Sequence, residues 1–155
     1  MRAIRKSRSP DDSVTPTSIK PVSVEQMLAV AKFLPVFENI KPEDFSKSAP
    51  LPENCSYGIG FVEFHPAVYE FINACYENEF VQSYDWTAWG RKARQYMADP
   101  SLVASARIST LVKLLTAHIR CERFCDGHLH SQFESGHLTA ILRRLEELAH
   151  LESGN

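Results

Sequence analysis

At 155 residues, with 44% hydrophobic and 23% charged residues, the chain has the composition of one ordinary globular domain. The formal net charge of -2 argues against a dedicated nucleic-acid-binding protein, whose basic face usually shows in the overall balance. No apolar run approaches the roughly 18 residues that a membrane-spanning helix needs. Four cysteines and no secretory signal predict reduced thiols and a cytoplasmic protein.

The charge is distributed unevenly along the chain. Residues 1–22 hold five basic and two acidic residues, a charge of +3, so the rest of the chain carries -5. This segment also contains Pro10, Pro16 and Pro21 among few apolar residues, which predicts a disordered arm. A single helical domain is expected over residues 23–155. Only the arm has a charge that suits nucleic acid or another acidic partner.

Helical patterns begin immediately after the arm. Ser23 and Gln26 have the spacing of a capping box, and they start a helix that Pro35 should stop. Pro66 suits the first turn of a second helix, which should run to about residue 80. The one strand-like segment, residues 58–64, has no obvious partner with which to pair.

Two further helix starts lie in the second half of the chain. Asp85 is a natural N-cap, and the helix behind it would carry Trp86 and Trp89 on one face. A helix face with two tryptophans more often packs in a core, although the two rings can also stack on a planar ligand. Asp99 and Pro100 begin a long helix, expected to reach residue 125 and to span roughly 39 Å.

Glycines and leucines mark the remaining elements. Gly127 should end the long helix in the left-handed conformation, and Gly136 should end a shorter helix after it. A stripe of leucines over residues 138–151 predicts an amphipathic last helix. The predicted fold class is therefore all-α: a compact bundle of about five helices with a long central one and at most a trace of β structure.

Four motifs occur in order from Tyr84 onward. They are Asp85-Trp86-x-x-Trp89, Leu111-x-Lys-Leu-Leu-Thr-x-His-Ile-Arg120, Arg123-Phe-Cys-x-Gly-His-Leu129 and Phe133-Glu-x-Gly136. Together they resemble a family of uncharacterised bacterial proteins known only as a domain of unknown function. The resemblance covers roughly the C-terminal half of the chain. It implies a bacterial or phage origin and a small helical domain, and it implies no reaction.

The stretch from Arg120 to His130 concentrates groups that bind metals, grip anions or move protons. The guanidinium forks of Arg120 and Arg123 match a phosphate or a carboxylate. With His128 as proton donor or acceptor and Glu134 to orient it, a hydrolytic or phosphoryl-transfer site can be drawn. The competing interpretation is structural, because cations at a helix C-terminus also cap carbonyls and pair with nearby acids.

Zinc is another interpretation of the same stretch. His118, Cys121 and Cys125 recur on one predicted helix face, and His128 or His130 could complete four ligands. Leucines lead onto that face, however, and a buried cysteine behaves as a small hydrophobic residue. Core packing therefore competes with metal binding for these residues.

The function predicted from the sequence is that of a binding or interaction module, for a protein or an anionic ligand, with no chemistry of its own. One alternative is an enzyme that uses Arg120, Arg123, His128 and Glu134. The other is a zinc-stabilised module, the only interpretation that requires a cofactor. The leucine stripe of the last helix also suits pairing with a second copy of the chain.

Overall fold

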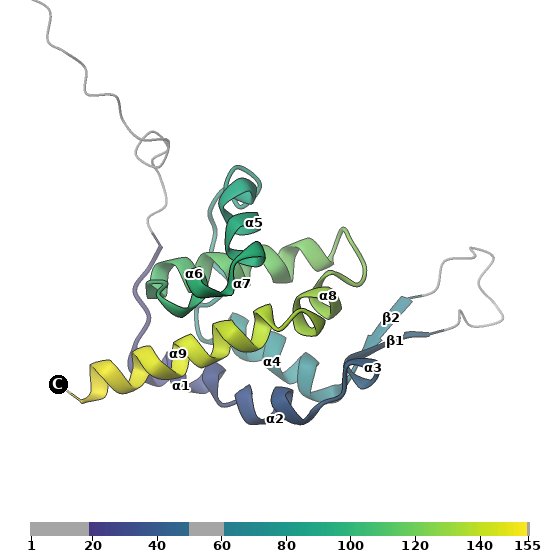
Figure 1. The fold of residues 1–155 in the computed structure, drawn as a ribbon, viewed down its shortest axis with the longest axis horizontal. Coiled ribbons are helices and arrows are strands. Elements are labelled where there is room, and N and C mark those ends of the chain that lie inside the picture. Colours follow the sequence, from purple (N-terminus) through teal and green to yellow (C-terminus); the bar gives the residue numbers. More distant parts are fainter. Residues whose placement is uncertain (1–18, 50–60, 155) are drawn as a thin grey trace, which may run out of the picture.

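The computed structural model describes residues 19–49 and 61–154, which are helical apart from one small sheet (Figure 1). The predicted all-α class is confirmed. None of the helices in these ranges is long and apolar enough to span a membrane. The helices are α1 (Val24–Ala31), α2 (Leu34–Asn39), α3 (Pro42–Phe45), α4 (Pro66–Glu77), α5 (Gly90–Ala98), α6 (Pro100–Ala104), α7 (Ile108–Glu122), α8 (His128–Glu134) and α9 (His137–Ser153); the strands are β1 (Ser46–Ala49) and β2 (Phe61–Phe64).

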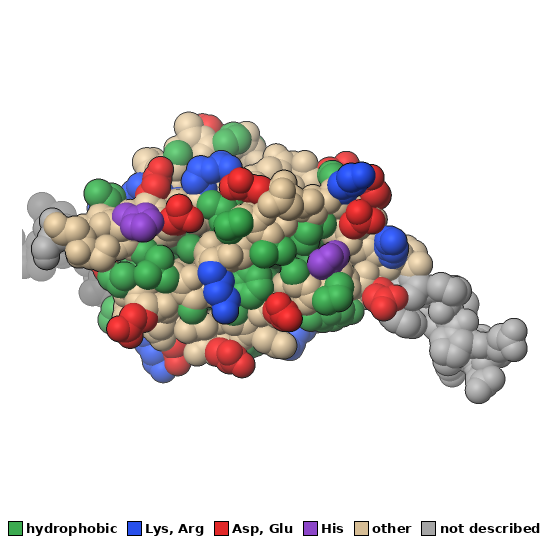
Figure 2. All heavy atoms as spheres, turned by 90° about the horizontal axis from the view of Figure 1, so that it is seen from below, with side chains coloured by type: hydrophobic (Ala, Val, Ile, Leu, Met, Phe, Trp, Pro, Cys, Tyr) green, Lys and Arg blue, Asp and Glu red, His purple; other side chains and the backbone are tan. Residues whose placement is uncertain are grey.

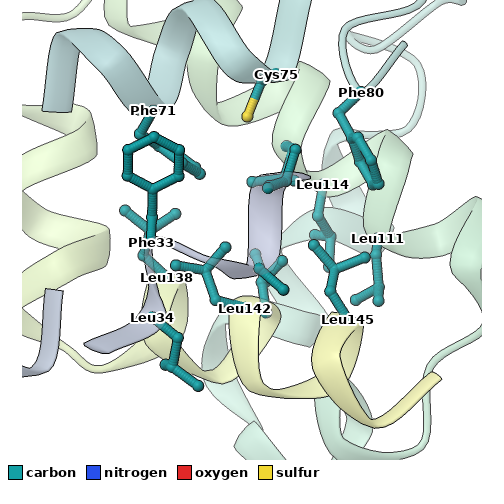
Figure 3. Packing of buried hydrophobic residues seen from close by; sticks show 14 of the residues in the cluster. Phe33, Leu34, Phe71, Cys75, Phe80, Leu111, Leu114, Leu138, Leu142 and Leu145 are labelled. Atoms are coloured by element: carbon teal, nitrogen blue, oxygen red, sulfur yellow. The ribbon is translucent and has the colours of Figure 1, made fainter. Parts of the chain in front are cut away.

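Helix α9 is the element against which most others pack. It contacts α1, α2, α6, α7 and α8, and its predicted leucine stripe faces the core. In Figure 3, Leu142 and Leu145 of this helix lie toward Leu114 and Leu111 of α7, whereas Leu138 lies toward Phe33. All five leucine side chains are fully buried. Because each such leucine stabilises the fold by about 1.5–3 kcal/mol, this seam holds the two longest helices together.

A cluster of phenylalanines fixes the other end of the core. Phe45 of α3 stacks on Phe133 of α8, with ring centroids 4.3 Å apart and an interplanar angle of 17°. Phe37 of α2 meets both rings edge-on, and Phe71 of α4 packs against Phe37. Aromatic pairs of this kind add about 0.5–1.5 kcal/mol beyond the area that they bury. The cluster therefore joins α2, α3, α4 and α8.

The predicted long helix is broken into α6 and α7. In a continuous helix the carbonyl of Ala106 would accept a hydrogen bond from residue 110, but here it accepts one from Nε of Arg144, at 2.9 Å. The N–H of Thr110 donates to Arg107 instead. The longest helix among the described residues is therefore α9, and the central helix is shorter than predicted.

Proline and strand predictions need smaller corrections. Pro35 was expected to stop the first helix, but α1 already ends at Ala31, and Pro35 lies in the first turn of α2. The strand-like segment does find a partner, because β2 pairs with β1 antiparallel, with Ser46 opposite Phe64. The capping box of Ser23 and Gln26 is confirmed.

Most of the predicted arm, residues 1–18, lies outside the described residues, and only its last residues can be compared with the structure. The backbone of Lys20 exchanges two hydrogen bonds with the side chain of Gln82, and Val22 is buried in the core. Residues 20–22 therefore belong to the folded domain.

The two tryptophans do not share a helix face. The carboxylate of Asp85 accepts hydrogen bonds from Thr87 and from the N–H of Ala88, so it closes a turn, and α5 begins only at Gly90. Trp89 consequently stacks on Tyr96 within the α5 region, with ring centroids 6.0 Å apart. Trp86 points elsewhere, toward the end of α7.

Candidate functional site

The turn between α7 and α8 is held by a carboxylate. Glu122, the last residue of α7, accepts hydrogen bonds from the N–H groups of Gly127 (3.0 Å) and Leu129 (2.8 Å). These are free donors at the start of α8, where negative charge is favourable. Gly127 takes the predicted left-handed conformation, with φ of 94°. A side chain there would meet no atom within 4 Å, so the backbone conformation is what favours glycine.

Three histidines form a hydrogen-bonded chain beside this turn. Nδ1 of His118 lies 2.9 Å from Nε2 of His128, and Nε2 of His118 lies 2.9 Å from Nε2 of His137. His118 is only 1% exposed, and His137 only 5%. The cluster joins α7 to the first residues of α8 and α9, so it ties three helices at one point.

The cluster is satisfied without any net charge. A neutral imidazole has one donor and one acceptor, so His118 can donate to one neighbour while it accepts from the other. Burial, followed by the charges of His137 and His128, lowers the pKa of His118 well below 6.5. Burial also lowers the pKa of His128, against the opposing charge of Glu122, and lowers that of His137 to about 4. All three rings are therefore neutral near pH 7.

This arrangement separates the residues of the predicted enzyme site. His128 is positioned by His118, not by Glu134. The carboxylate of Glu134 lies instead 3.4 Å from Nε2 of His130, a residue that the sequence offered only as an alternative zinc ligand. The four predicted residues therefore do not converge on one reacting position.

The predicted zinc ligands are not arranged around a metal either. Both ring nitrogens of His118 face other histidines, Cys121 is half-buried, and Cys125 is exposed. Burial raises the pKa of the Cys121 thiol, with smaller contributions from Cys125 and Glu122, which disfavours the thiolate that binds zinc. Within the described ranges, no group of three or more His, Cys, Asp or Glu side chains could hold a metal ion.

The two arginines lie on another side of the α7 end, among aromatic rings. Phe124 is 80% exposed and stacks on Trp86, with centroids 6.2 Å apart and an interplanar angle of 22°. Arg123 donates from Nη2 to the hydroxyl of Tyr76, at 2.9 Å. We call Tyr76, Trp86, Arg120, Arg123 and Phe124 the aromatic–arginine patch. In Figure 1 the α7–α8 turn that carries Phe124 lies at the opposite end of the molecule from the C-terminus.

Neither arginine of this patch is neutralised by a carboxylate of the described residues. Of the residues that the structure describes, none forms an ion pair with Arg120 or Arg123. Nε of Arg120 is, in the described part of the chain, the one buried side-chain nitrogen or oxygen without a hydrogen-bond partner. Burial raises the pKa of Tyr84, and the positive charge of Arg120 opposes this increase. The predicted ion-pair network around the arginines is therefore not formed within residues 19–49 and 61–154.

A repeat in the sequence marks His137, a histidine that was not among the predicted site residues. The tripeptide Gly-His-Leu occurs at residues 127–129 and again at 136–138. Both glycines are left-handed, and each following histidine is the first residue of a helix. Two equivalent helix starts thus present His128 and His137 to the same partner on α7.

Comparison with known proteins gives a family. Residues 22–151 match the family model described as "Family of unknown function (DUF6508)". The match extends well beyond the C-terminal half in which the motifs were recognised. The chain matches no curated protein and no solved structure.

Proposed function

The chain belongs to the family of unknown function DUF6508, and we propose that it is an interaction module whose aromatic–arginine patch binds an acidic protein segment. One observation carries the proposal. Phe124, 80% exposed, lies over Trp86 on a surface whose two arginines have no carboxylate partner among the described residues.

The composition of the patch suits the centre of a protein interface. Tryptophan, tyrosine and arginine are the residues most enriched at positions that dominate binding energy. Burying Phe124 and Tyr76 would remove apolar area from water, and the stacked Trp86 already holds the Phe124 ring in place. Little conformational entropy is then lost when a partner covers these rings.

The charge of the patch selects the partner. A guanidinium binds a carboxylate through two parallel hydrogen bonds, and no carboxylate of the described residues pairs with Arg120 or Arg123. The chain beyond residue 22 carries a net charge of -5, so positive charge at this patch is a local exception. Elsewhere charges of both signs are interspersed, as on the face shown in Figure 2.

Two other occupants fit less well. A second copy bound through the same patch would bring like-charged arginines together, because a two-fold contact repeats each residue across the interface. Nucleic acid needs more phosphate contacts than two arginines on an acidic domain supply. A protein segment with carboxylates beside an apolar or aromatic anchor satisfies both the rings and the arginines.

The proposal is tested with peptides displayed on phage. Random peptides are selected on the immobilised full chain, and the affinity of the selected sequences is measured by titration. We expect enrichment of acidic peptides with an aromatic or apolar residue. Their affinity should fall about tenfold or more for Phe124→Ala and for Arg123→Ala.

Leu151→Ala is the matched control. Leu151 is also a largely exposed apolar side chain, but it lies near the end of α9. Its removal should leave the affinity unchanged. Selected peptides without acidic enrichment, equal binding to the patch variants and wild type, or no selected peptide at all would each contradict the proposal.

A further inference from the structure

A serine, a histidine and a carboxylate form a row where β1 meets α8. Oγ of Ser46 lies 2.6 Å from Nδ1 of His130, and Nε2 of His130 lies 3.4 Å from Oε2 of Glu134. This is the order of groups that activates a serine for nucleophilic attack. The row is separate from both the three-histidine cluster and the aromatic–arginine patch.

The carboxylate favours the tautomer that such chemistry needs. Negative charge beside Nε2 of His130 favours a proton on that nitrogen, which leaves Nδ1 free to accept. Ser46 then donates its hydroxyl hydrogen to Nδ1. The serine–imidazole bond uses Nδ1, whereas serine hydrolases usually use Nε2, but either nitrogen can act as the base.

The ring of His130 is also held from its side. Phe45 meets it edge-on, with centroids 5.7 Å apart and an interplanar angle of 86°. Phe45 is itself fully buried and stacked on Phe133. Ser46 directly follows Phe45 in the chain, so the same packing positions both the serine and the histidine.

The row opens onto a hollow of about 510 Å³. Besides Ser46 and His130, its lining includes Lys47, Ser48, Val62 and Asp126. The volume suits a small ligand. Lys47, whose ammonium lies 3.8 Å from the carboxylate of Asp44, also lines the hollow and adds a positive charge where an oxyanion would form on a bound substrate, whereas Asp126 adds a negative one.

We propose that Ser46 is the nucleophile of an acyl-transfer site for small carboxylic esters. Ser46 Oγ attacks the ester carbonyl carbon while its proton passes to Nδ1 of His130. The bond to the leaving alcohol then breaks, and the alcohol oxygen takes that proton. Water attacks the acyl-serine with His130 again as base, which releases the carboxylic acid and returns the proton to Ser46. Glu134 stabilises the imidazolium formed in each step.

The test is covalent labelling of the full chain with a fluorophosphonate probe, followed by peptide mapping. The map of the wild-type protein should place the adduct on Ser46, and incubation with p-nitrophenyl acetate should acetylate the same residue. Ser131→Ala is the matched control, because Ser131 is an exposed serine of α8 that does not line the hollow. Labelling should persist in Ser131→Ala and disappear in Ser46→Ala.

A second variant separates catalysis from packing. His130→Gln keeps a polar group beside Ser46 but cannot take up a proton, so the labelling rate should fall about tenfold or more at an unchanged melting temperature. Peptide mapping of the wild-type protein gives its result whether or not a variant folds. No adduct, an adduct no more frequent on Ser46 than on Ser48, or an unchanged rate in His130→Gln would overturn the proposal and leave the Ser46–His130 bond as a link between β1 and α8.

Discussion

Two sides of the α7 end differ in how their polar groups are used. On one side, His118 gives both ring nitrogens to His128 and His137 and is almost completely removed from water. On the other, Arg120 has a buried nitrogen without a partner, and Phe124 is left in solvent. Most residues of the two sides lie within one short stretch of sequence. From the sequence alone, the histidines look as reactive as the arginines.

Of the two sides, the aromatic–arginine patch is the one with interactions left for a partner. A polar cluster whose donors and acceptors match each other is fully occupied in holding the fold. A patch with unmatched guanidinium groups and an exposed ring has interactions left to make. Changes on the histidine side should therefore lower stability, and changes on the patch side should lower binding.

The largest effect is expected from His118→Ala. The variant leaves a cavity and removes the partner of both His128 and His137, so the free energy of unfolding should fall by about 3–4 kcal/mol. Denaturant unfolding measures it. His150→Ala, an exposed histidine on α9, is the control and should stay within about 0.5 kcal/mol of wild type. A loss below about 1 kcal/mol for His118→Ala would mean that the cluster does not hold the three helices.

Acid should weaken the same side. The unfolded chain takes up protons on its histidines below about pH 6.5, whereas the folded cluster resists them because its pKa values are lowered. Stability is therefore fully present above pH 6.5 and falls as the pH drops toward 4. His137 alone accounts for about 3 kcal/mol of this loss at pH 4. Denaturant titrations measure the free energy of unfolding at each pH in this range. It should fall less steeply with decreasing pH for His137→Gln than for the wild-type protein. A wild-type free energy that does not change with pH would refute the prediction.

Phe124→Ala should produce the opposite pattern. Affinity for the selected acidic peptide should fall about tenfold or more, equivalent to about 1.4 kcal/mol. The free energy of unfolding should change by less than about 1 kcal/mol, because the ring is 80% exposed and contributes to stability mainly through its stack on Trp86. A large loss of stability would show that the ring serves the fold.

The smallest effect is expected from Arg123→Lys. The charge remains, but the planar fork that can hold a carboxylate and reach Tyr76 is lost, so affinity should fall about fivefold. The control is Arg143→Lys, since Arg143 is an exposed arginine of α9 that pairs with Glu38. Titration calorimetry with the same peptide distinguishes the two. Equal affinities would mean that only charge matters at this position.

Local signals predicted most of the fold. The capping box at Ser23, the left-handed glycines 127 and 136 and the leucine stripe of α9 each depend on neighbours within a few residues. The break before α7 depends on Arg144, which lies 38 residues from the carbonyl that it binds. Such a long-range contact leaves no periodic trace in the sequence.

The contacts of the residues in the candidate stretch could not be predicted from the sequence. The stretch from Arg120 to His130 does contain both sides of the α7 end. The pairing of His118 with His137 and of Glu134 with His130 depends on how α8 and α9 turn back onto α7. Trp86 was expected on a helix, yet the turn closed by Asp85 directs it to Phe124. Only the repeated Gly-His-Leu tripeptide could have indicated the histidine cluster beforehand.

The most direct test measures peptide affinity and the free energy of unfolding on both His118→Ala and Phe124→Ala. The predicted result is a crossed pattern: His118→Ala loses stability but, while folded, binds the acidic peptide as wild type does, and Phe124→Ala keeps its stability but binds about tenfold more weakly. If both variants lose both properties in proportion, the two sides of the α7 end are not distinct, and the patch is not a separate binding surface.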